Sequence, residues 1–287
     1  MEQTIDRVDG FTCRPMPPAR VPIWMGRLRM SYRFLRYLRW SLVNRHLRGV
    51  RDAVAALNEL SLLSLKDFFG PKTGVECNIC GWRGSKFYPN AGSGYSEMNI
   101  GCPRCHCIHR YRSLAAILDA KTEFFSQGSS VIEVAPVRGF QAYSLWRKNG
   151  SNYISFDLEK FGMEKGDLTA MRFGDNSCEF FVCFHVLEHV PAEDKALREI
   201  FRVLRPNGVA ILQVPIDYKL TETIEYGFAN RFETNHVRRY SEKGFFESLT
   251  ASGFLVSKVG VHDLFDRETA IKYGLDSEPV YFAQKPG

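Results

Sequence analysis

The sequence lacks the long apolar runs that membrane-spanning helices need. No stretch approaches the roughly 18 uncharged apolar residues of such a helix, and the opening residues, MEQTIDRVDG, have none of the apolar character of a secretory signal. Internal repeats are missing as well. Hydrophobic residues make up 45% of the 287 residues and charged residues 24%, which excludes a mainly disordered, collagen-like or coiled-coil chain. We therefore expect a globular, cytoplasmic protein whose eight cysteines are thiols or metal ligands rather than disulfides.

Lysine is missing from the first 65 residues, yet this segment carries the positive excess of the chain. It contains eleven arginines and five acidic residues, so its net charge is +6. The whole protein also has a net charge of +6, so the positive and negative charges of the remaining residues cancel. Apolar residues recur there at helical spacing and predict a basic amphipathic helix over about 24–48, followed by a second helix over about 50–64. The first helix is defined by Leu28, Phe34, Leu35, Leu38 and Leu42 on one side and by Arg29, Arg33 and Arg36 on the opposite arc.

This arm has three candidate roles. Aromatic residues beside the arginines (Trp24, Tyr32, Tyr37 and Trp40) are typical of an anchor on a membrane surface. Arginine also suits the phosphates of a nucleic acid or an acidic groove of a protein. The third alternative is a helix packed on the rest of the chain, with its arginines solvated or paired. Any anionic membrane surface or other anionic partner should be contacted by this arm, with nucleic acid as the second choice.

Composition divides the chain into a helical arm over 1–70, a cysteine-rich segment over 71–112 and a third segment over 113–287. The third segment alternates apolar strands with helical patterns, which predicts a mostly parallel sheet covered on both faces. Residues 262–278 show no clear helical pattern, so we expect them to be irregular and the last strand to run antiparallel. The expected strands are 131–135, 153–158, 180–186, 209–215, 255–261 and 279–284, and the expected helices are 140–148, 191–204 and a helix that Ser241 caps and Gly253 ends.

Two Cys-x2-Cys pairs lie 21 residues apart in the cysteine-rich segment. Each pair presents two thiolates, and two pairs complete the tetrahedral site that a structural zinc ion prefers. We therefore predict that Cys77, Cys80, Cys102 and Cys105 bind zinc in a small zinc ribbon. A closed site of four thiolates leaves no position for a substrate, so we expect it to support the fold rather than the chemistry.

Other ligating and basic side chains follow the second cysteine pair. His106, Cys107 and His109 are alternative zinc ligands, although each fits the pairing less well. Arg110 and Arg112, together with His109, could contact a nucleic acid or an anionic substrate. Contacts to a carboxylate or a carbonyl between the domains are the favoured interpretation.

Polar side chains stand where strands of the third segment end, which is where ligands bind in open α/β sheets. The first strand runs into Glu133-Val-Ala135-Pro-Val-Arg-Gly139, with a single glycine where a dinucleotide fingerprint has several. Asp157 ends the second strand, 24 residues past Glu133, where a carboxylate is expected to accept ribose hydroxyls. His185 ends the buried strand FFVCFHV.

Two runs, DLTAMRFGDNSCEFFVCFHVLEHVP and ALREIFRVLRPNGVAILQVP, resemble class I S-adenosylmethionine-dependent methyltransferases, especially the type-11 methyltransferase domain family. The resemblance covers about 130–287, and CPRCHCIHRYRSLAAIL and HVRRY extend it to about 75 in a bacterial branch with an N-terminal zinc-ribbon-like segment. It implies an α/β fold with a doubly wound, seven-stranded, mostly parallel Rossmann-like sheet, and S-adenosylmethionine as cofactor. Ala135 and Val137 depart from the family by standing where it has glycines.

The resemblance also implies a role for each matching residue. Glu133 would lie near the amino-acid end of the cofactor, with the backbone from Ala135 to Gly139 passing close to it. Asp157 would accept the ribose hydroxyls. The remaining contacts would come from Asp167 and the backbone of Leu168, which would read the adenine, and from His185, which would face the methyl group. Asp175 is interpreted as a turn residue. Glu188 and His189 could have a role in the site or could equally be a helix-capping pair.

Methyl transfer to a hydroxyl benefits from a base, for which His185 and His236 are the candidates. His236 lies in an insert, 216–240, whose basic and aromatic residues suit a sugar, a phosphate-bearing acceptor or an anionic small molecule; a lid packed on its own aromatic residues is the alternative. We expect an S-adenosylmethionine-dependent methyltransferase acting on a hydroxyl of a small molecule or glycan. An RNA methyltransferase and an inactive Rossmann-like scaffold are the alternative functions.

Overall fold

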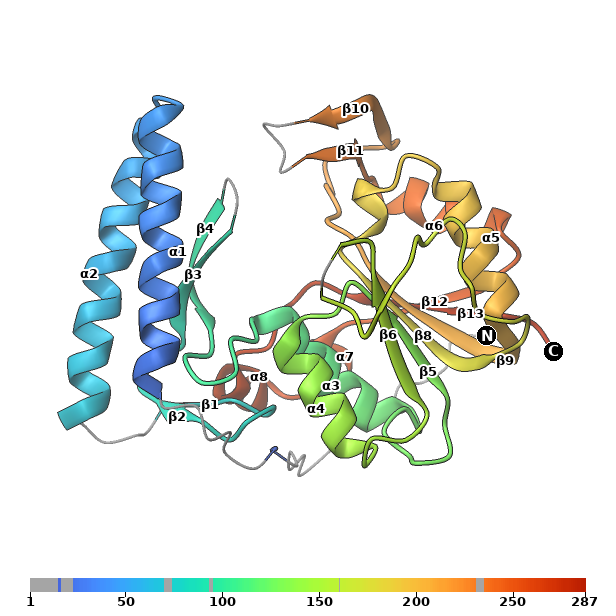
Figure 1. Cartoon of the computed structure of the whole chain (residues 1–287), viewed down its shortest axis with the longest axis horizontal. Coiled ribbons are helices and arrows are strands. Elements are labelled where there is room, and N and C mark those ends of the chain that lie inside the picture. The colour runs from blue at the N-terminus through green and yellow to red at the C-terminus, as the bar shows by residue number, and fades with distance from the viewer. Residues whose placement is uncertain (1–14, 17–22, 70–73, 93–94, 160, 231–234) are drawn as a thin grey trace. The chain divides into compact units, whose positions relative to one another are not determined.

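The computed structural model describes residues 15–16, 23–69, 74–92, 95–159, 161–230 and 235–287 (Figure 1). The predicted boundary at Gly70-Pro71, and Arg231 and Phe232 of the predicted insert, lie outside these residues. The chain forms two compact units, which are described separately. Unit 1 contains the described part of 1–120 together with 138–143 and 261–278, and unit 2 contains 121–137, 144–260 and 279–287.

Unit 1 contains a hairpin of two long helices, α1 (Ile23–Val43) and α2 (Leu47–Phe69), which lie side by side (Figure 1). The first helix ends about five residues earlier than predicted. Arg45 in the connecting turn has a left-handed backbone with φ of 53°, which a helix does not tolerate. No described helix, in either unit, is both long and apolar enough to cross a membrane.

The prediction of which side of α1 is buried was wrong. Met30, Phe34, Tyr37 and Ser41 form the buried stripe, and only Phe34 belongs to the predicted apolar side. Leu28, Leu35 and Leu42 are 60%, 53% and 59% exposed, because at 100° per residue they lie opposite that stripe. The buried stripe faces partners within unit 1. Arg33 lies beside this stripe, and its Nη1 donates a hydrogen bond to Oδ1 of Asn90 at 2.9 Å.

The rest of unit 1 is built around short antiparallel strands and further helices. Residues 262–278, predicted to be irregular, contain most of α7 and all of α8. Asp266 caps α8 by accepting a hydrogen bond from the backbone N–H of Thr269 at 2.7 Å, and Gly274 ends it with φ of 54°. The elements are β1 (Val75–Glu76), β2 (Arg83–Gly84), β3 (Tyr88–Gly92), β4 (Tyr95–Gly101), α3 (His109–Lys121), α7 (Val261–Leu264) and α8 (Arg267–Tyr273).

Unit 2 is built on the seven-stranded sheet that the resemblance implied. Its strand order is β12-β13-β9-β8-β5-β6-β7. The pairs β5/β6, β5/β8, β6/β7 and β8/β9 are parallel, and only β13 runs antiparallel to its neighbours, as predicted for the last strand. The strands are β5 (Val131–Val134), β6 (Tyr153–Asp157), β7 (Glu164–Lys165), β8 (Cys178–Phe184), β9 (Leu204–Gln213), β12 (Leu255–Val259) and β13 (Val280–Gln284).

Two helices, α5 (Glu193–Val203) and α6 (Glu242–Ala251), pack their apolar sides on this sheet (Figure 1). Ser241 caps α6 by accepting from the backbone N–H of Gly244 at 3.0 Å, and Gly253 follows its end with φ of 94°, as predicted. The other elements named below are α4 (Arg138–Arg147), the 3-10 turn η1 (Leu187–His189) and a hairpin of β10 (Ile224–Asn230) and β11 (His236–Arg239) within the predicted insert.

Candidate functional site

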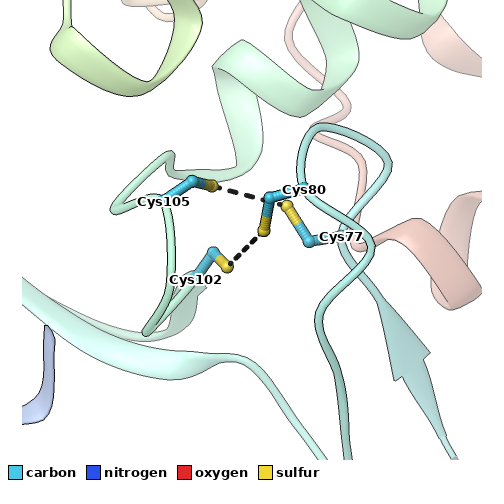
Figure 2. A group of neighbouring side chains, drawn as sticks. All are labelled: Cys77, Cys80, Cys102 and Cys105. Carbon is cyan, nitrogen blue, oxygen red and sulfur yellow. Dashed lines mark hydrogen bonds between the residues drawn. The ribbon is translucent and has the colours of Figure 1, made fainter. Parts of the chain in front are cut away.

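The four predicted cysteines of unit 1 come together in space. Figure 2 shows Cys77 facing Cys105 and Cys80 facing Cys102, with sulfur–sulfur distances of 3.6 and 3.5 Å. All four sulfur atoms lie within 4.8 Å of one another. A tetrahedral zinc ion with Zn–S bonds of about 2.3 Å places its sulfur ligands about 3.8 Å apart, so the arrangement fits that ion closely. The alternative ligands His106, Cys107 and His109 lie outside this group.

The two cysteine pairs adopt the same backbone turn. The N–H of Gly81 donates to the carbonyl of Cys77 at 2.8 Å, and the N–H of His106 donates to the carbonyl of Cys102 at 3.0 Å. Gly81 and His106 occupy equivalent positions and both are left-handed, with φ of 66° and 61°. A histidine tolerates this conformation less readily than glycine, so the second turn is held by its surroundings. Such equivalence is expected of two knuckles that share one ion.

Arg112 is a fully buried cation beside the cysteine group. Its guanidinium donates to the carbonyls of Tyr273, Ile100, Cys107 and Gly274 at 2.8 to 3.1 Å and lies 3.6 Å above the ring centre of Phe87. Burial lowers the pKa of this guanidinium, and the neighbouring cysteine thiolates oppose that change. The favoured interpretation, a carbonyl contact between the predicted segments, is confirmed for Arg112 by its bonds to Tyr273 and Gly274.

His109 contacts carboxylates of unit 1. Its Nε2 lies 3.3 Å from Asp276 Oδ2 and 3.9 Å from Glu97 Oε2. The favoured interpretation is thus confirmed for His109 too.

Gly139 also belongs to unit 1, at the start of α4. A Cβ atom at this position would lie 2.4 Å from the carbonyl oxygen of Cys105 and 2.5 Å from Cys107 Sγ. Only glycine allows that approach, so the single glycine of the first strand's turn is needed for packing against the second knuckle. Its predicted contact with a cofactor stays a prediction.

In unit 2, the strand order reverses between β5 and β8, and Ala135 and Asp157 lie at the carboxyl ends of β5 and β6. Ala135 has a left-handed backbone with φ of 48°, and its N–H donates to the carbonyl of Phe156 at 2.8 Å. This conformation explains why a glycine is the usual residue at the turn. Asp157 is partly exposed and accepts the N–H of Glu159 at 2.7 Å through Oδ1. The turn after β5 and the Asp157 carboxylate thus lie at the switch point where open α/β sheets bind ligands.

Glu133 lies one strand position below this edge and is only 2% exposed. Its carboxyl accepts a hydrogen bond from the hydroxyl of Tyr153 on the neighbouring strand β6. Burial raises the pKa of Glu133 to about 8, although the hydrogen bond from Tyr153 lowers it. No pattern in the sequence predicted this contact. The predicted role of Glu133 at the amino-acid end of a cofactor stays a prediction.

The turn that follows β7 contains Asp167 and Leu168. Asp167 is exposed, and its Oδ1 accepts the backbone N–H and the hydroxyl of Thr169, both at 2.8 Å. Leu168 has a buried side chain within the core of unit 2. Only its backbone could read a base, as the resemblance implied.

His185 follows β8 with a left-handed backbone, φ 55°, and its side chain pairs with Glu188. Nδ1 of His185 lies 3.2 Å from Oε1 of Glu188, whose side chain is only 2% exposed. Burial raises the pKa of Glu188, but the hydrogen bond and charge of His185 outweigh it and hold that pKa below its usual value. Nε2 of His185 and Oε2 of Glu188 are buried and have no hydrogen-bond partner. Glu188 therefore orients the imidazole and does not cap a helix.

This segment of unit 2 matches a known family. Residues 123–212 match the family model described as a methyltransferase domain. The match contains β5, β6, β8 and β9, with Glu133, Asp157 and His185 among the predicted site residues. The predicted resemblance to methyltransferases is thus confirmed for this domain, whereas the bacterial branch with a zinc ribbon stays a prediction.

Individual relatives are more distant. Two uncharacterised methyltransferases of Mycobacterium sp., strains KMS and MCS, are each 28% identical over 115 residues, which is 36% of this chain and 45% of theirs. The match therefore spans less than half the length of these curated relatives. One similar solved structure is a 1,6-didemethyltoxoflavin-N1-methyltransferase of Burkholderia thailandensis, with 18% identity and a TM-score of 0.41, covering 55% of this chain and 72% of that one. Another is an S-adenosylmethionine-dependent methyltransferase of Mesorhizobium loti, with 13% identity and a TM-score of 0.45, covering 60% of this chain and 98% of that one. The fold class rests on the strand order of this chain itself.

His236, the second predicted base, lies beyond the matched methyltransferase domain, at the start of β11. Its ring lies against that of His189, with ring centres 4.8 Å apart. One ring nitrogen of each histidine and a carboxylate oxygen of Glu188 lie within 4.8 Å of one another. The structure thus brings His236 to the segment that also carries His185, through a pairing that the sequence did not indicate.

Arg238 holds β11 against the turn of the matched segment that carries Glu188. It is 3% exposed and donates to the carbonyls of Leu187, Val190 and Pro191 at 2.9, 2.7 and 3.2 Å. Its Nε also pairs with Glu225 Oε1 at 2.7 Å. In the sequence Arg238 suggested an anionic acceptor, whereas its guanidinium contacts the protein itself.

Proposed function

We propose that this protein is an S-adenosylmethionine-dependent methyltransferase that methylates a hydroxyl of a small molecule or glycan. The observation that carries the proposal is the strand order of unit 2, with its switch point between β5 and β8 inside the matched methyltransferase domain. The His185–Glu188 pair beside that switch point supports a hydroxyl acceptor, because it has the form of an oriented general base.

The residues of unit 2 fit the cofactor in their chemistry. S-Adenosylmethionine, when bound, supplies a methyl group on a sulfonium that is a good leaving group. The partly exposed Asp157 carboxylate would accept its ribose hydroxyls, and the left-handed turn at Ala135 would bring backbone close to it. Asp167 and the backbone of Leu168 would contact the adenine. The buried, unpartnered Nε2 of His185 is the kind of polar atom that a ligand satisfies.

His185 has the orientation that a base requires. Because Nδ1 faces the Glu188 carboxylate and can donate a hydrogen bond to it, Nε2 is the ring nitrogen that is left to contact an acceptor. Nε2 can then accept the proton of an acceptor hydroxyl, while Glu188 stabilises the imidazolium that forms. The other contribution of these residues to catalysis is to position the acceptor hydroxyl in line with the methyl group.

Calorimetry with S-adenosylmethionine tests this function. We expect the full chain to bind the cofactor, and Asp157→Ala to weaken binding about 10- to 100-fold, since hydrogen bonds to a charged group contribute about 1.5–3 kcal/mol. Asp175→Ala is the matched control, because Asp175 is an exposed carboxylate that pairs with Arg202 at 2.7 Å. Its affinity should equal that of the wild type.

The acceptor is identified by transfer of labelled methyl from the cofactor to fractions of a cell extract. Label in a small-molecule or glycan fraction supports the proposal, and label in RNA would replace it by the RNA methyltransferase alternative. Absence of cofactor binding would favour the scaffold. A His185→Ala variant that binds cofactor but transfers no label would establish His185 as the base, and undiminished transfer would exclude that role.

We further propose that the four cysteines bind a structural zinc ion. The equivalent knuckle turns and the sulfur–sulfur distances of 3.5 and 3.6 Å support it. The buried Arg112 provides one positive charge beside an ion whose four thiolates leave the site negatively charged. The site offers no open coordination position, so its role is to stabilise unit 1.

The helical hairpin is proposed to contact an anionic membrane surface. Leu28, Leu35 and Leu42 are exposed on the outer side of α1, and the exposed Arg29 and Arg36 lie nearby on the same helix. Apolar and arginine side chains combined in this way are typical of peripheral membrane helices. The inner stripe of α1 packs within unit 1, so the hairpin can present these side chains without unfolding.

Flotation with phosphatidylcholine vesicles, with and without phosphatidylglycerol, tests the membrane contact. The full chain should float with the anionic vesicles, and more weakly at high salt. Replacing Leu28, Leu35 and Leu42 by serine should lower the bound fraction about tenfold or more, since each leucine gains about 1 kcal/mol or more on leaving water. Leu255→Ser, at an exposed leucine of β12, is the control. Salt-sensitive RNA retention without flotation would instead indicate a nucleic-acid partner.

A further inference from the structure

We propose that Glu188, His189 and His236 bind a divalent first-row transition-metal ion, which holds the oxygen of the acceptor. The site itself stands on the geometry of unit 2, and the role of the ion rests on the proposed function. One carboxylate oxygen and two ring nitrogens, all within 4.8 Å of one another, form the donor set. Two imidazoles and one carboxylate are ligands that such ions accept, and they leave open coordination positions.

Glu188 provides the strongest sign of a missing partner. Its two carboxylate oxygens have different surroundings: Oε1 contacts Nδ1 of His185 at 3.2 Å, and Oε2 is buried without any hydrogen-bond partner. A buried carboxylate oxygen left unsatisfied is costly, and a bound cation removes that cost. The oxygen that lacks a partner is thus Oε2 of Glu188, the residue that lies close to His189 and His236.

His189 is oriented as a metal ligand usually is. Its Nδ1 lies 3.3 Å from the backbone carbonyl of Asn235, which can only accept a hydrogen bond. Nδ1 is therefore the ring nitrogen that donates, and Nε2 is the nitrogen left for an ion. Metal-bound histidines commonly donate their second ring nitrogen to a carbonyl in this way. Asn235 directly precedes His236, so one short segment both orients His189 and supplies the third ligand.

Arg238 fixes the two segments that carry the ligands. Its hydrogen bonds to the carbonyls of Leu187, Val190 and Pro191 surround the Glu188–His189 pair and tie it to β11, where His236 lies. The positive charge of Arg238 does not oppose a cation, because Glu225 pairs with it at 2.7 Å. In a coordinated site the ligand atoms lie about 3–3.5 Å apart, so binding needs an approach of about 1–2 Å, which rotation of the exposed His189 can provide.

The open positions define what the ion does. A divalent ion that binds a hydroxyl oxygen lowers the pKa of that hydroxyl. The proton that leaves the oxygen is accepted by Nε2 of His185, the residue that shares Glu188 with the ion. His236 is then a metal ligand rather than the base, which assigns different tasks to the two histidines predicted as catalytic.

Cobalt(II) is the probe, because its visible absorption distinguishes nitrogen and oxygen ligands from thiolates. The full chain, with zinc already bound by its cysteines, is titrated with CoCl₂. We expect one Co²⁺ per chain to bind with a spectrum free of thiolate charge-transfer bands. His236→Ala and His189→Ala should each weaken binding at least about tenfold. His262→Ala, at an exposed histidine of unit 1, should bind like the wild type.

Glu188→Gln is the third variant, and circular dichroism checks its fold. If it does not fold, the exposed His189 still provides a ligand variant that tests the site. Failure of the wild type to bind Co²⁺, or binding by the His189 and His236 variants that is as tight as that of the wild type, would overturn the proposal and make the two rings a packing contact. Cofactor calorimetry stays independent of this result, so loss of the metal site leaves the methyltransferase proposal standing.

Discussion

Removal of zinc is expected to unfold the two knuckles of unit 1 while the sheet of unit 2 keeps its structure. Binding of a structural zinc ion to four cysteines contributes about 10–16 kcal/mol, which is as large as the entire stability of an ordinary domain. The described strands of segment 75–107 pair only as two-stranded sheets, and its two knuckle turns close on the carbonyls of Cys77 and Cys102. Without the ion, the four cysteines, of which Cys77, Cys80 and Cys102 are buried, become neutral thiols, and the buried Arg112 loses the negative charge of the thiolates beside it.

The effect is measured by hydrogen–deuterium exchange after chelation, and in the variant Cys77→Ser/Cys80→Ser. Protection should be lost from Cys77 to Cys107 and kept in β5, β8 and β9. Elemental analysis should find about one zinc per wild-type chain and almost none in the double variant. Cys178→Ala removes a buried cysteine of β8 that lies outside the group and should retain the ion. A zinc-free wild type, together with a double variant that keeps its protection, would contradict the metal site.

The sheet and the cysteine group were predictable because local signals determine both. Alternating apolar runs and helical patterns require parallel strands, and the antiparallel final strand followed from the lack of a helical pattern before it. The spacing of the Cys-x2-Cys pairs was sufficient to place four sulfur atoms together. Ser241 and Gly253 marked the ends of α6 through their backbone chemistry alone.

The buried side of α1 could not be predicted, because the helix has two apolar stripes. Leucines at 28, 35 and 42 and the larger side chains at 30, 34 and 37 both follow helical spacing. Periodicity identifies a helix, but which stripe is covered depends on partners such as β3, far along the chain. The same limit explains α8, whose cap at Asp266 is a single-residue signal within a short helix.

The candidate site shows a related limit for charged residues. In the sequence, Arg112 follows a cysteine pair, where a contact within the protein was the favoured interpretation, and Arg238 lies in an insert for which an anionic acceptor and a packed lid were both open. Both guanidiniums are buried and bind three or four carbonyls of the protein, and no local pattern indicates which carbonyls these are. Likewise the contact of His189 with the segment of Asn235 and His236 joins parts of the chain 46 residues apart, which no local pattern encodes.

Glu133 is expected to make the free energy of unfolding decrease as the pH rises through the neutral range. Its pKa is about 8 in the folded protein and 4.5 in the unfolded chain, because burial disfavours the charged carboxylate. Below pH 4.5 the carboxyl is protonated in both states and its full stabilising effect is present. That stability is lost as the pH rises towards 8, where the folded protein must bury a charge. At about 1.36 kcal/mol per pH unit, the loss reaches about 5 kcal/mol at most.

Glu133→Gln should remove this dependence, since a glutamine still accepts the hydrogen bond from Tyr153 but does not titrate. Urea unfolding at about pH 5 and about pH 9 measures it: wild-type stability should drop between the two, and the drop should be smaller in the variant. Glu247→Gln, at an exposed glutamate of α6, should leave the wild-type drop unchanged. Equal drops in the wild type and Glu133→Gln would show that Glu133 is ionised in the folded protein.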